Sequence, residues 1–131
     1  MRRVLVDTNV IVSALIFPES APAHTLGTVI ETDHLVLTQW ILDELREVVG
    51  RKWADRLPAL ELFLNTVGYE LLNVGAPGTE IRDVNDQPIL DAAISGHVDM
   101  IITGDKDFLA LQIDRPLILT AREYLDSTAQ R

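Results

Sequence analysis

The sequence predicts an α/β protein of three layers, in which a central parallel sheet of about five strands is flanked by helices in a Rossmann-like arrangement. Short apolar runs rich in Val, Ile and Leu recur along the chain, and helical patterns separate them. This alternation is typical of parallel sheets, whose strands are buried on both faces. With 131 residues, 47% of them hydrophobic, the chain is long enough for one core, so we expect residues 1–131 to form a single domain.

The strands are predicted from five apolar runs that are too short for helices. They lie at residues 4–6, 35–37, 71–74, 100–102 and 117–119. The helical patterns span residues 22–32, 39–49, 57–67, 89–96 and 121–128, with Thr38 as the expected N-cap of the second helix. Residues 75–79 (GAPGT) form the clearest loop signal, and they are too few to separate two domains.

The composition excludes several classes of function. Eleven Lys and Arg oppose 20 Asp and Glu, and the resulting net charge of −9 disfavours binding of nucleic acid or anionic lipid through net charge alone. A local basic patch remains compatible with it. The absence of Cys excludes disulfides, thiolate metal sites and cysteine nucleophiles. The first apolar run is too short for a signal sequence or a membrane span, so we expect a soluble cytoplasmic protein.

Acidic residues directly follow two of the predicted strands. Asp7 comes after the run at 4–6, and Asp105 and Asp107 come shortly after the run at 100–102. In open parallel sheets, ligands bind beyond the carboxyl ends of the strands. We therefore expect these carboxylates to lie at the functional edge of the sheet.

Helical phase selects two further acids. At about 100° per residue, Glu44 lies on the flank of the apolar stripe of its helix, whereas Asp43 and Glu47 point nearly opposite to the stripe. By the same argument Asp86 lies on the inward side of the fourth predicted helix, and Asp91 points away from the core. Glu44 and Asp86 are thus the helical acids best placed to reach the edge of the sheet.

Each of these acids also has a structural explanation. Asp7 could end its strand as a turn residue, Asp86 could be a simple N-cap before Gln87-Pro88, and Glu44 could be a solvated charge. Asp105 and Asp107 could be turn and cap residues of a short following segment, and Asp107 is the one we favour for a structural role.

Taken together, the acids predict a cation site. Carboxylates gathered without basic partners repel one another and are driven toward protonation unless a cation lies between them. Oxygen ligands without Cys or a His cluster favour Mg²⁺ or Mn²⁺ over zinc. A partly hydrated ion of this kind suits phosphate chemistry.

Four segments, in this order and spacing, resemble the PIN-domain nuclease family over nearly the whole chain. They are residues 4–10 (VLVDTNV), Glu44-Leu45 with the preceding Thr38, residues 83–86 (DVND) followed by Ile89-Leu90 and Ala93, and residues 103–108 (TGDKDF). The resemblance implies a parallel sheet with flanking helices. It also implies an acidic pocket for Mg²⁺ or Mn²⁺ and hydrolysis of phosphodiester bonds in single-stranded RNA.

Carried over by motif, the resemblance assigns roles to individual residues. Asp7, Glu44, Asp86 and Asp105 correspond to the family's catalytic and metal-binding acids, and Asp107 corresponds to a less constant fifth metal ligand. Asn9 and Thr103 correspond to supporting polar residues. The implied mechanism is in-line attack of water on phosphorus, with the carboxylates holding one or two ions. Small members of the family are similar to the toxins of toxin–antitoxin pairs, so the resemblance also implies a homodimer and a cognate antitoxin protein.

The expected substrate conflicts with the local charge. Between Glu80 and Asp107 the chain carries seven acids and two bases. A concentration of positive charge lies elsewhere, at Arg46, Arg51, Lys52 and Arg56, and it is either a solvated helix end or an RNA-binding rim.

Three alternatives fit an acidic pocket on a parallel sheet. A receiver-like phosphotransfer domain requires an Asp at the end of its third strand, where this chain runs into Gly75. A dehalogenase-like phosphatase requires a second Asp two residues after the first, where this chain has Asn9. The third alternative is a PIN fold retained as a non-catalytic interaction module, and the complete acidic set argues against it.

Overall fold

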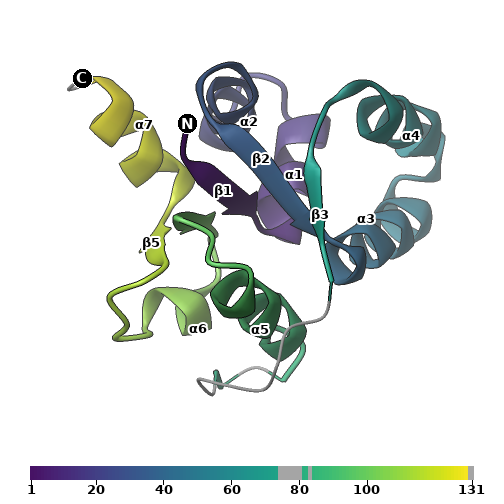
Figure 1. The fold of residues 1–131 in the computed structure, drawn as a ribbon. Helices are drawn as coiled ribbons and strands as arrows, with labels where there is room; N and C mark the ends of the chain where they lie inside the picture. The colour runs from purple at the N-terminus through teal and green to yellow at the C-terminus, as the bar shows by residue number, and fades with distance from the viewer. Residues whose placement is uncertain (74–80, 83, 130–131) are drawn as a thin grey trace.

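The structure is a computed structural model that describes residues 1–73, 81–82 and 84–129. Within these residues, five strands alternate with seven α-helices and one 3₁₀ turn (Figure 1). The elements are β1 (Arg3–Val6), α1 (Thr8–Ile16), α2 (Ala21–Thr32), β2 (His34–Thr38), α3 (Gln39–Lys52), η1 (Ala54–Arg56), α4 (Leu57–Thr66), β3 (Glu70–Leu72), α5 (Gln87–Ser95), β4 (Met100–Ile102), α6 (Lys106–Leu109), β5 (Leu117–Leu119) and α7 (Ala121–Ala129).

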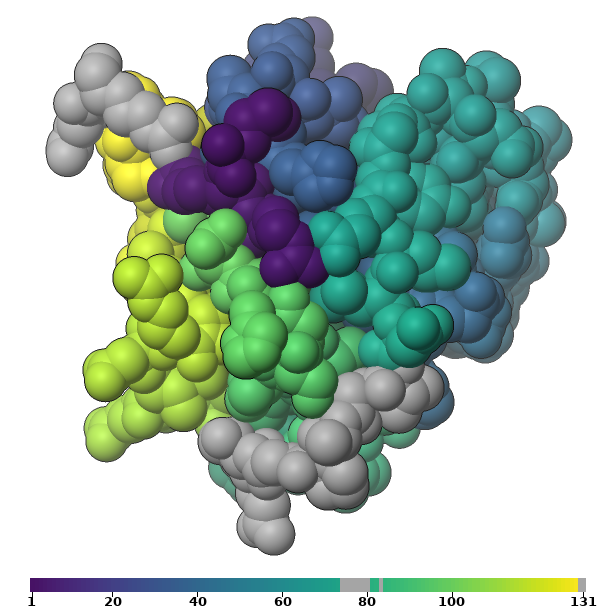
Figure 2. All heavy atoms as spheres, viewed as in Figure 1, coloured from purple at the N-terminus to yellow at the C-terminus, as the bar shows by residue number. Residues whose placement is uncertain are grey.

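All the strands are parallel, and they lie in the order β3-β2-β1-β4-β5. The central strand is β1, in which Leu5 is in register with Val36 on one side and Ile101 on the other. These three side chains have no exposed surface. In the space-filling view, the purple N-terminal residues accordingly lie against blue, teal and green segments (Figure 2). The three-layer α/β fold with a parallel sheet, predicted from the sequence, is confirmed.

Several helices contact one another as well as the sheet. α2 contacts both α1 and α7, and α3 contacts α1 and α4. In Figure 1, α5 and α6 lie at the end of the molecule toward which β1 runs, apart from α2 and α4. None of the helices in the described residues is long and apolar enough to span a lipid bilayer.

The helix α1 was not among the predicted elements. Its sequence, TNVIVSALI, is apolar nearly throughout and rich in β-branched residues, so it shows no clear helical period. The helix is nevertheless favoured because Asp7 caps its amino end, and Val10, Ile11 and Val12 are all buried. A helix surrounded by other elements needs no polar face.

Most predicted boundaries differ from those observed by one to three residues, and the helix predicted at 39–49 extends to Lys52. The third strand covers Glu70–Leu72 instead of 71–74, and Glu70 pairs with Val36. Val74 and the predicted loop at 75–79 lie outside the described residues. The helix α5 begins at Gln87, two residues earlier than predicted, with Pro88 in its first turn.

Candidate metal centre

The candidate site is built on the carboxyl end of β1. The backbone N–H of Asp7 donates to the carbonyl of Ile102 at 2.9 Å, which continues the ladder between β1 and β4 by one residue. The side chain of Asp7 then caps α1, because its Oδ1 accepts the backbone N–H of Thr8 at 2.8 Å. Asp7 is only 4% exposed. The strand end therefore places a buried carboxylate in a fixed orientation.

Thr103, at the end of β4, links Asp7 to the next acid. Its hydroxyl donates to Oδ2 of Asp7 at 2.9 Å and accepts the backbone N–H of Asp105 at 3.0 Å. Thr103 is completely buried. Both oxygens of Asp7 thus accept hydrogen bonds from neutral donors, and the backbone at Asp105 is held in place by the same hydroxyl.

Three carboxylates converge next to this network. One oxygen from each of Asp86, Asp105 and Asp107 lies within 4.8 Å of the others. Asp105 caps the short helix α6 by accepting the backbone N–H of Asp107 at 2.7 Å. Asp86 occupies the N-cap position of α5, but its side chain makes no capping hydrogen bond there. The simple N-cap explanation of Asp86 is therefore wrong, whereas Asp105 has a structural role in addition to its place in the cluster.

Glu44 joins the same network from α3. It is half-buried, and its carboxylate accepts the Thr8 hydroxyl at 2.9 Å. Thr8 is 4% exposed and also donates its backbone N–H to Asp7. Sequence analysis assigned no role to Thr8, although a polar residue after a strand-end acid and before an apolar helix was a usable signal. The hydrogen bonds thus connect Glu44, Asp7 and Asp105 across three elements.

The donors fit a hard divalent cation. Carboxylate oxygens close together and held by neutral hydroxyl and amide groups are the ligand type that Mg²⁺ and Mn²⁺ prefer. Burial, and less strongly the nearby Asp105, raise the pKa of Asp7 above its ordinary value, while hydrogen bonds from Thr103 and Thr8 act in the opposite direction. A cation beside Asp7 would offset this cost of ionisation. Asp7 and Glu44 adjoin the three converging acids and are not part of that cluster.

Two expectations about the acids need correction. Asp91 does not point away from the core: it is 9% exposed, and its Oδ1 accepts the side-chain amide of Gln87 at 2.8 Å. A polar neighbour one turn earlier on the same helix allows its burial. The sequence also favoured Asp107 over Asp105 as the structural residue, yet the residue that caps α6 is Asp105.

The basic residues predicted as an RNA-binding rim lie on α3, from its middle to its last turn, and in η1. Glu44 and Arg51 are seven residues apart, about 10 Å along the helix axis. Three of the four cations are paired with carboxylates: Arg46 with Glu61 at 3.1 Å, Arg51 with Glu47 at 2.9 Å and Arg56 with Asp55 at 3.8 Å. The ammonium of Lys52 lies over the ring of Trp53.

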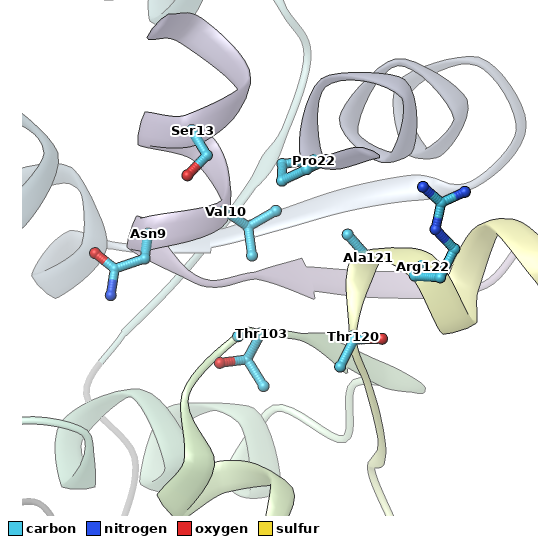
Figure 3. Close-up of a pocket in the computed structure, with 9 residues that line it drawn as sticks. Asn9, Val10, Ser13, Pro22, Thr103, Thr120, Ala121 and Arg122 are labelled. Carbon is cyan, nitrogen blue, oxygen red and sulfur yellow. The ribbon is translucent and has the colours of Figure 1, made fainter. Parts of the chain in front are cut away.

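Asn9 is exposed and lines, together with Thr103, a hollow next to the network (Figure 3). Asn9 comes from the first turn of α1, one residue after Thr8. The structure thus places both predicted supporting residues beside the acids, on the side that faces α7.

The geometry is consistent with the family that the sequence resembles. The PIN domain family matches residues 3–107, so the chain belongs to this family. The match includes all five predicted acids and ends before β5 and α7. Comparison with curated proteins gives no significant match.

A solved structure shows the same fold. The chain is similar to one in the crystal structure of VapBC2 from Rickettsia felis bound to a DNA fragment from their promoter, with a TM-score of 0.66. The sequences are 21% identical, and the similarity covers 89% of this chain and 96% of the other. At this level of identity, the comparison establishes the fold.

Proposed function

We propose that the protein is a metal-dependent endoribonuclease that hydrolyses phosphodiester bonds in single-stranded RNA, and that residues 1–131 act as one nuclease domain. The observation that carries the proposal is the convergence of Asp86, Asp105 and Asp107, whose carboxylate oxygens lie within 4.8 Å of one another beside buried Asp7. Membership of the PIN domain family supports it, since PIN domains are typically nucleases that use divalent metals.

In this proposal, Asp86, Asp105 and Asp107 hold Mg²⁺ or Mn²⁺ together with Asp7 and Glu44. A bound divalent ion supplies the positive charge that polarises a phosphodiester and makes water a stronger acid. The protein orients the carboxylates. Thr8 and Thr103 fix both oxygens of Asp7, and Thr8 also orients Glu44.

The chemical step is an in-line attack of water on phosphorus, and a carboxylate of this set accepts the proton that the water loses. The bond from phosphorus to the leaving oxygen breaks, and no covalent bond to the protein forms. Because Asp7, Glu44 and Asp105 accept hydrogen bonds from hydroxyl and backbone donors, their oxygens keep their positions while charge develops on the phosphate.

The test is cleavage of a labelled single-stranded RNA with Mg²⁺ or Mn²⁺, with chelator, and with metal restored after chelation. We expect cleavage only when metal is present, and weaker or no cleavage of single-stranded DNA of the same sequence. Asp105→Asn protein, prepared in the same way, detects contaminating nuclease. Cleavage that persists in chelator would exclude a metal-dependent reaction, and a folded protein that binds metal but cleaves no RNA would favour the non-catalytic interaction module.

We further propose that the protein is a cytoplasmic homodimeric toxin controlled by a cognate antitoxin. The similarity to a chain of the VapBC2 structure, which holds promoter DNA, supports this assignment. Expression of the chain alone should arrest growth, and co-expression of a small DNA-binding protein from the neighbouring reading frame should relieve the arrest. Sedimentation equilibrium of the purified chain tests the homodimer. Growth unaffected by an active nuclease would contradict the toxin assignment.

The basic residues Arg46, Arg51, Lys52 and Arg56 are proposed to form a weak RNA-binding rim, because the carboxylates paired with three of them offset part of their charge. Reversing the charge at Arg51 and Lys52 should weaken RNA binding at low salt and have little effect at high salt. An unchanged salt dependence would contradict this role.

A further inference from the structure

A hollow of about 270 Å³ lies beside the acid network, at the carboxyl ends of β1, β4 and β5. One of its walls is Thr103, the residue whose hydroxyl contacts Asp7 and the backbone of Asp105. Figure 3 shows that α1 and the start of α7 supply other walls. A group bound in the hollow would therefore lie next to the carboxylates.

The lining of the hollow suits a nucleotide. Its walls combine apolar groups, polar groups and one cation, supplied by Val10, Pro22 and Ala121, by Asn9 and Ser13, and by Arg122. A nucleobase has apolar faces and polar edges, and a cation at the wall can meet its phosphate. The volume is slightly below the range of about 300–1,000 Å³ for drug-sized ligands, so it suits a single base better than a larger group.

Arg122 has no evident structural role. It is exposed in the first turn of α7, where the helix dipole disfavours a positive charge, and it makes no ion pair with another described residue. The helix is capped without it, because Thr120 and Glu123 exchange hydrogen bonds of 3.0 and 3.1 Å. The guanidinium is therefore available for an anion.

The opposite side of the acid network has the reverse charge. A second hollow there is lined by Trp40 and by three carboxylates, those of Asp43, Glu44 and Glu47. Glu47 is paired with Arg51, but Asp43 still adds negative charge to this hollow. A nucleic acid strand carries one negative charge per nucleotide, so this hollow repels it more than the hollow beside Arg122 does. A strand that passes the acids is thus favoured to continue toward Arg122.

We propose that the hollow between α1 and α7 binds the nucleotide adjacent to the scissile phosphate of single-stranded RNA. The base lies against Val10 and Pro22, and the phosphate meets Arg122. The inference rests on the proposed ribonuclease function and adds a substrate-binding residue to it. Arg122 lies beyond the residues that match the PIN domain family, so the family pattern does not supply this assignment.

The first test compares Arg122→Ala with Arg115→Ala in Mn²⁺-dependent cleavage of a short single-stranded RNA. Arg115 precedes β5 and Arg122 follows it, so the two variants remove the same charge at opposite ends of one strand. We expect Arg122→Ala to raise KM about tenfold with kcat nearly unchanged, the effect of losing one hydrogen bond to a charged group. The slope of log KM against log salt should fall by about 0.7, the value for one phosphate contact on a single strand. Arg115→Ala should match the wild type.

A second variant changes the shape of the hollow without changing its charge. Ser13 is half-buried on α1 and lines the hollow, so Ser13→Leu narrows the hollow without changing its charge. We expect a higher KM and an unchanged salt slope. If Ser13→Leu instead abolishes binding of an antitoxin and leaves the KM for RNA unchanged, the hollow is a protein-binding site and the inference is wrong.

Nucleotide binding can also be measured without catalysis. Methyl NMR of the metal-free protein with each of the four nucleoside 5′-monophosphates should show shifts at Val10 and Ala121, and Arg122→Ala should weaken them. If wild-type protein cleaves RNA but Arg122→Ala changes neither KM nor the salt slope, the inference fails and the proposed function stands. If wild-type protein cleaves no RNA, the proposed function fails, and the presence or absence of the methyl shifts decides the inference.

Discussion

The two ends of the parallel sheet hold their acidic side chains in different ways. At the amino end, Glu70 forms an ion pair with Arg3 at 2.6 Å. At the carboxyl end, the hydrogen bonds to Asp7 come from the Thr103 hydroxyl and the backbone N–H of Thr8, which are neutral. The first arrangement neutralises charge within the protein, and the second orients a carboxylate without neutralising it.

Two other acids at the amino end also contact the start of the chain, and one of them is paired with an arginine. Asp33, which precedes β2, accepts hydrogen bonds from Arg2 at 3.1 Å and from the hydroxyl of Tyr124 at 2.6 Å. Asp99, which precedes β4, accepts the backbone N–H of Arg3 at 2.7 Å. These contacts tie α7 and β4 to the first strand, so the acids at this end stabilise the fold.

The pKa shifts at the two ends have opposite signs. The hydrogen-bonded ion pair with Arg3 lowers the pKa of Glu70, whereas burial raises the pKa of Asp7. The protein thus favours the charged form of Glu70 and disfavours the charged form of Asp7. A binding site for a cation disfavours the charged carboxylate in this way while it is empty, because the bound cation supplies the missing positive charge.

The largest expected effect comes from exchanging carboxylate for amide at each end. Asp105→Asn keeps a good N-cap for α6 but removes a ligand charge, so RNA cleavage should fall about a thousandfold while the fold persists. The matched variant Glu70→Gln, at the amino end, should leave the cleavage rate unchanged. Equal loss of cleavage in both variants would mean that the two ends do not differ in function.

Breaking the ion pair at the amino end should affect stability instead. The guanidinium of Arg3 donates to Glu70 and to the carbonyls of Gly96 and His97. Urea unfolding of Arg3→Met should show a free energy of unfolding about 2 kcal/mol lower than that of the wild type. The refolded variant should cleave RNA normally. Arg115 is exposed, so Arg115→Met is the control variant. If Arg3→Met lowers the free energy of unfolding no more than Arg115→Met does, the amino end of the sheet contributes little to stability.

A third prediction concerns the pH dependence of stability without metal. The pKa of Asp7 is raised from its ordinary 3.8, so the folded state binds the proton more tightly than the unfolded state. The stability that protonated Asp7 contributes is therefore lost as pH rises from about 3.8 through the raised pKa. In chelator, the stability of Asp7→Asn should therefore fall less than that of the wild type as pH rises from about 3.8 to 7. A difference that does not depend on pH would contradict the assigned direction.

The smallest effect has the opposite sign. The pKa of Glu70 is lowered from its ordinary 4.5, so its contribution is present above that pH and is lost as pH falls below it. Arg3 and Glu70 are both about one-third exposed, at 29% and 33%, so solvent screening limits the contribution to less than about 1 kcal/mol. Glu70→Gln should flatten the fall in stability below pH 4.5. If stability falls as steeply below pH 4.5 in Glu70→Gln as in the wild type, other carboxylates are responsible for that fall.

Much of the fold follows from simple sequence patterns. Strands buried on both faces appear as short apolar runs, and Asp7 and Thr103 lie at the carboxyl edge of the sheet because each follows such a run. The helix α1 could not be predicted from periodicity because nearly all of its faces are apolar. Its capping residue Asp7 is the available signal, but an acid after a strand is equally typical of a site residue or a turn.

The candidate site was less predictable than the fold. Helical phase places Glu44 on the flank of its helix, but it cannot show that the Thr8 hydroxyl meets it, since that contact depends on the packing of α1 against α3. Helical phase also predicts that Asp91 points away from the core, which is wrong. Asp91 is buried, because the side-chain amide of Gln87 donates a hydrogen bond to its carboxylate. The sequence does not single out Arg122, because the role proposed for it depends on where α7 begins relative to the acids.

The most direct test of the account is thermal or chemical unfolding of the wild-type protein as a function of Mn²⁺ concentration. If the carboxyl end of the sheet is a cation site, Mn²⁺ at about 100 times its Kd should raise the free energy of unfolding by about 2.7 kcal/mol. Glu70→Gln should respond like the wild type, and Asp105→Asn should require far more Mn²⁺. The account would be contradicted if Mn²⁺ left the wild type unchanged or stabilised Asp105→Asn equally well.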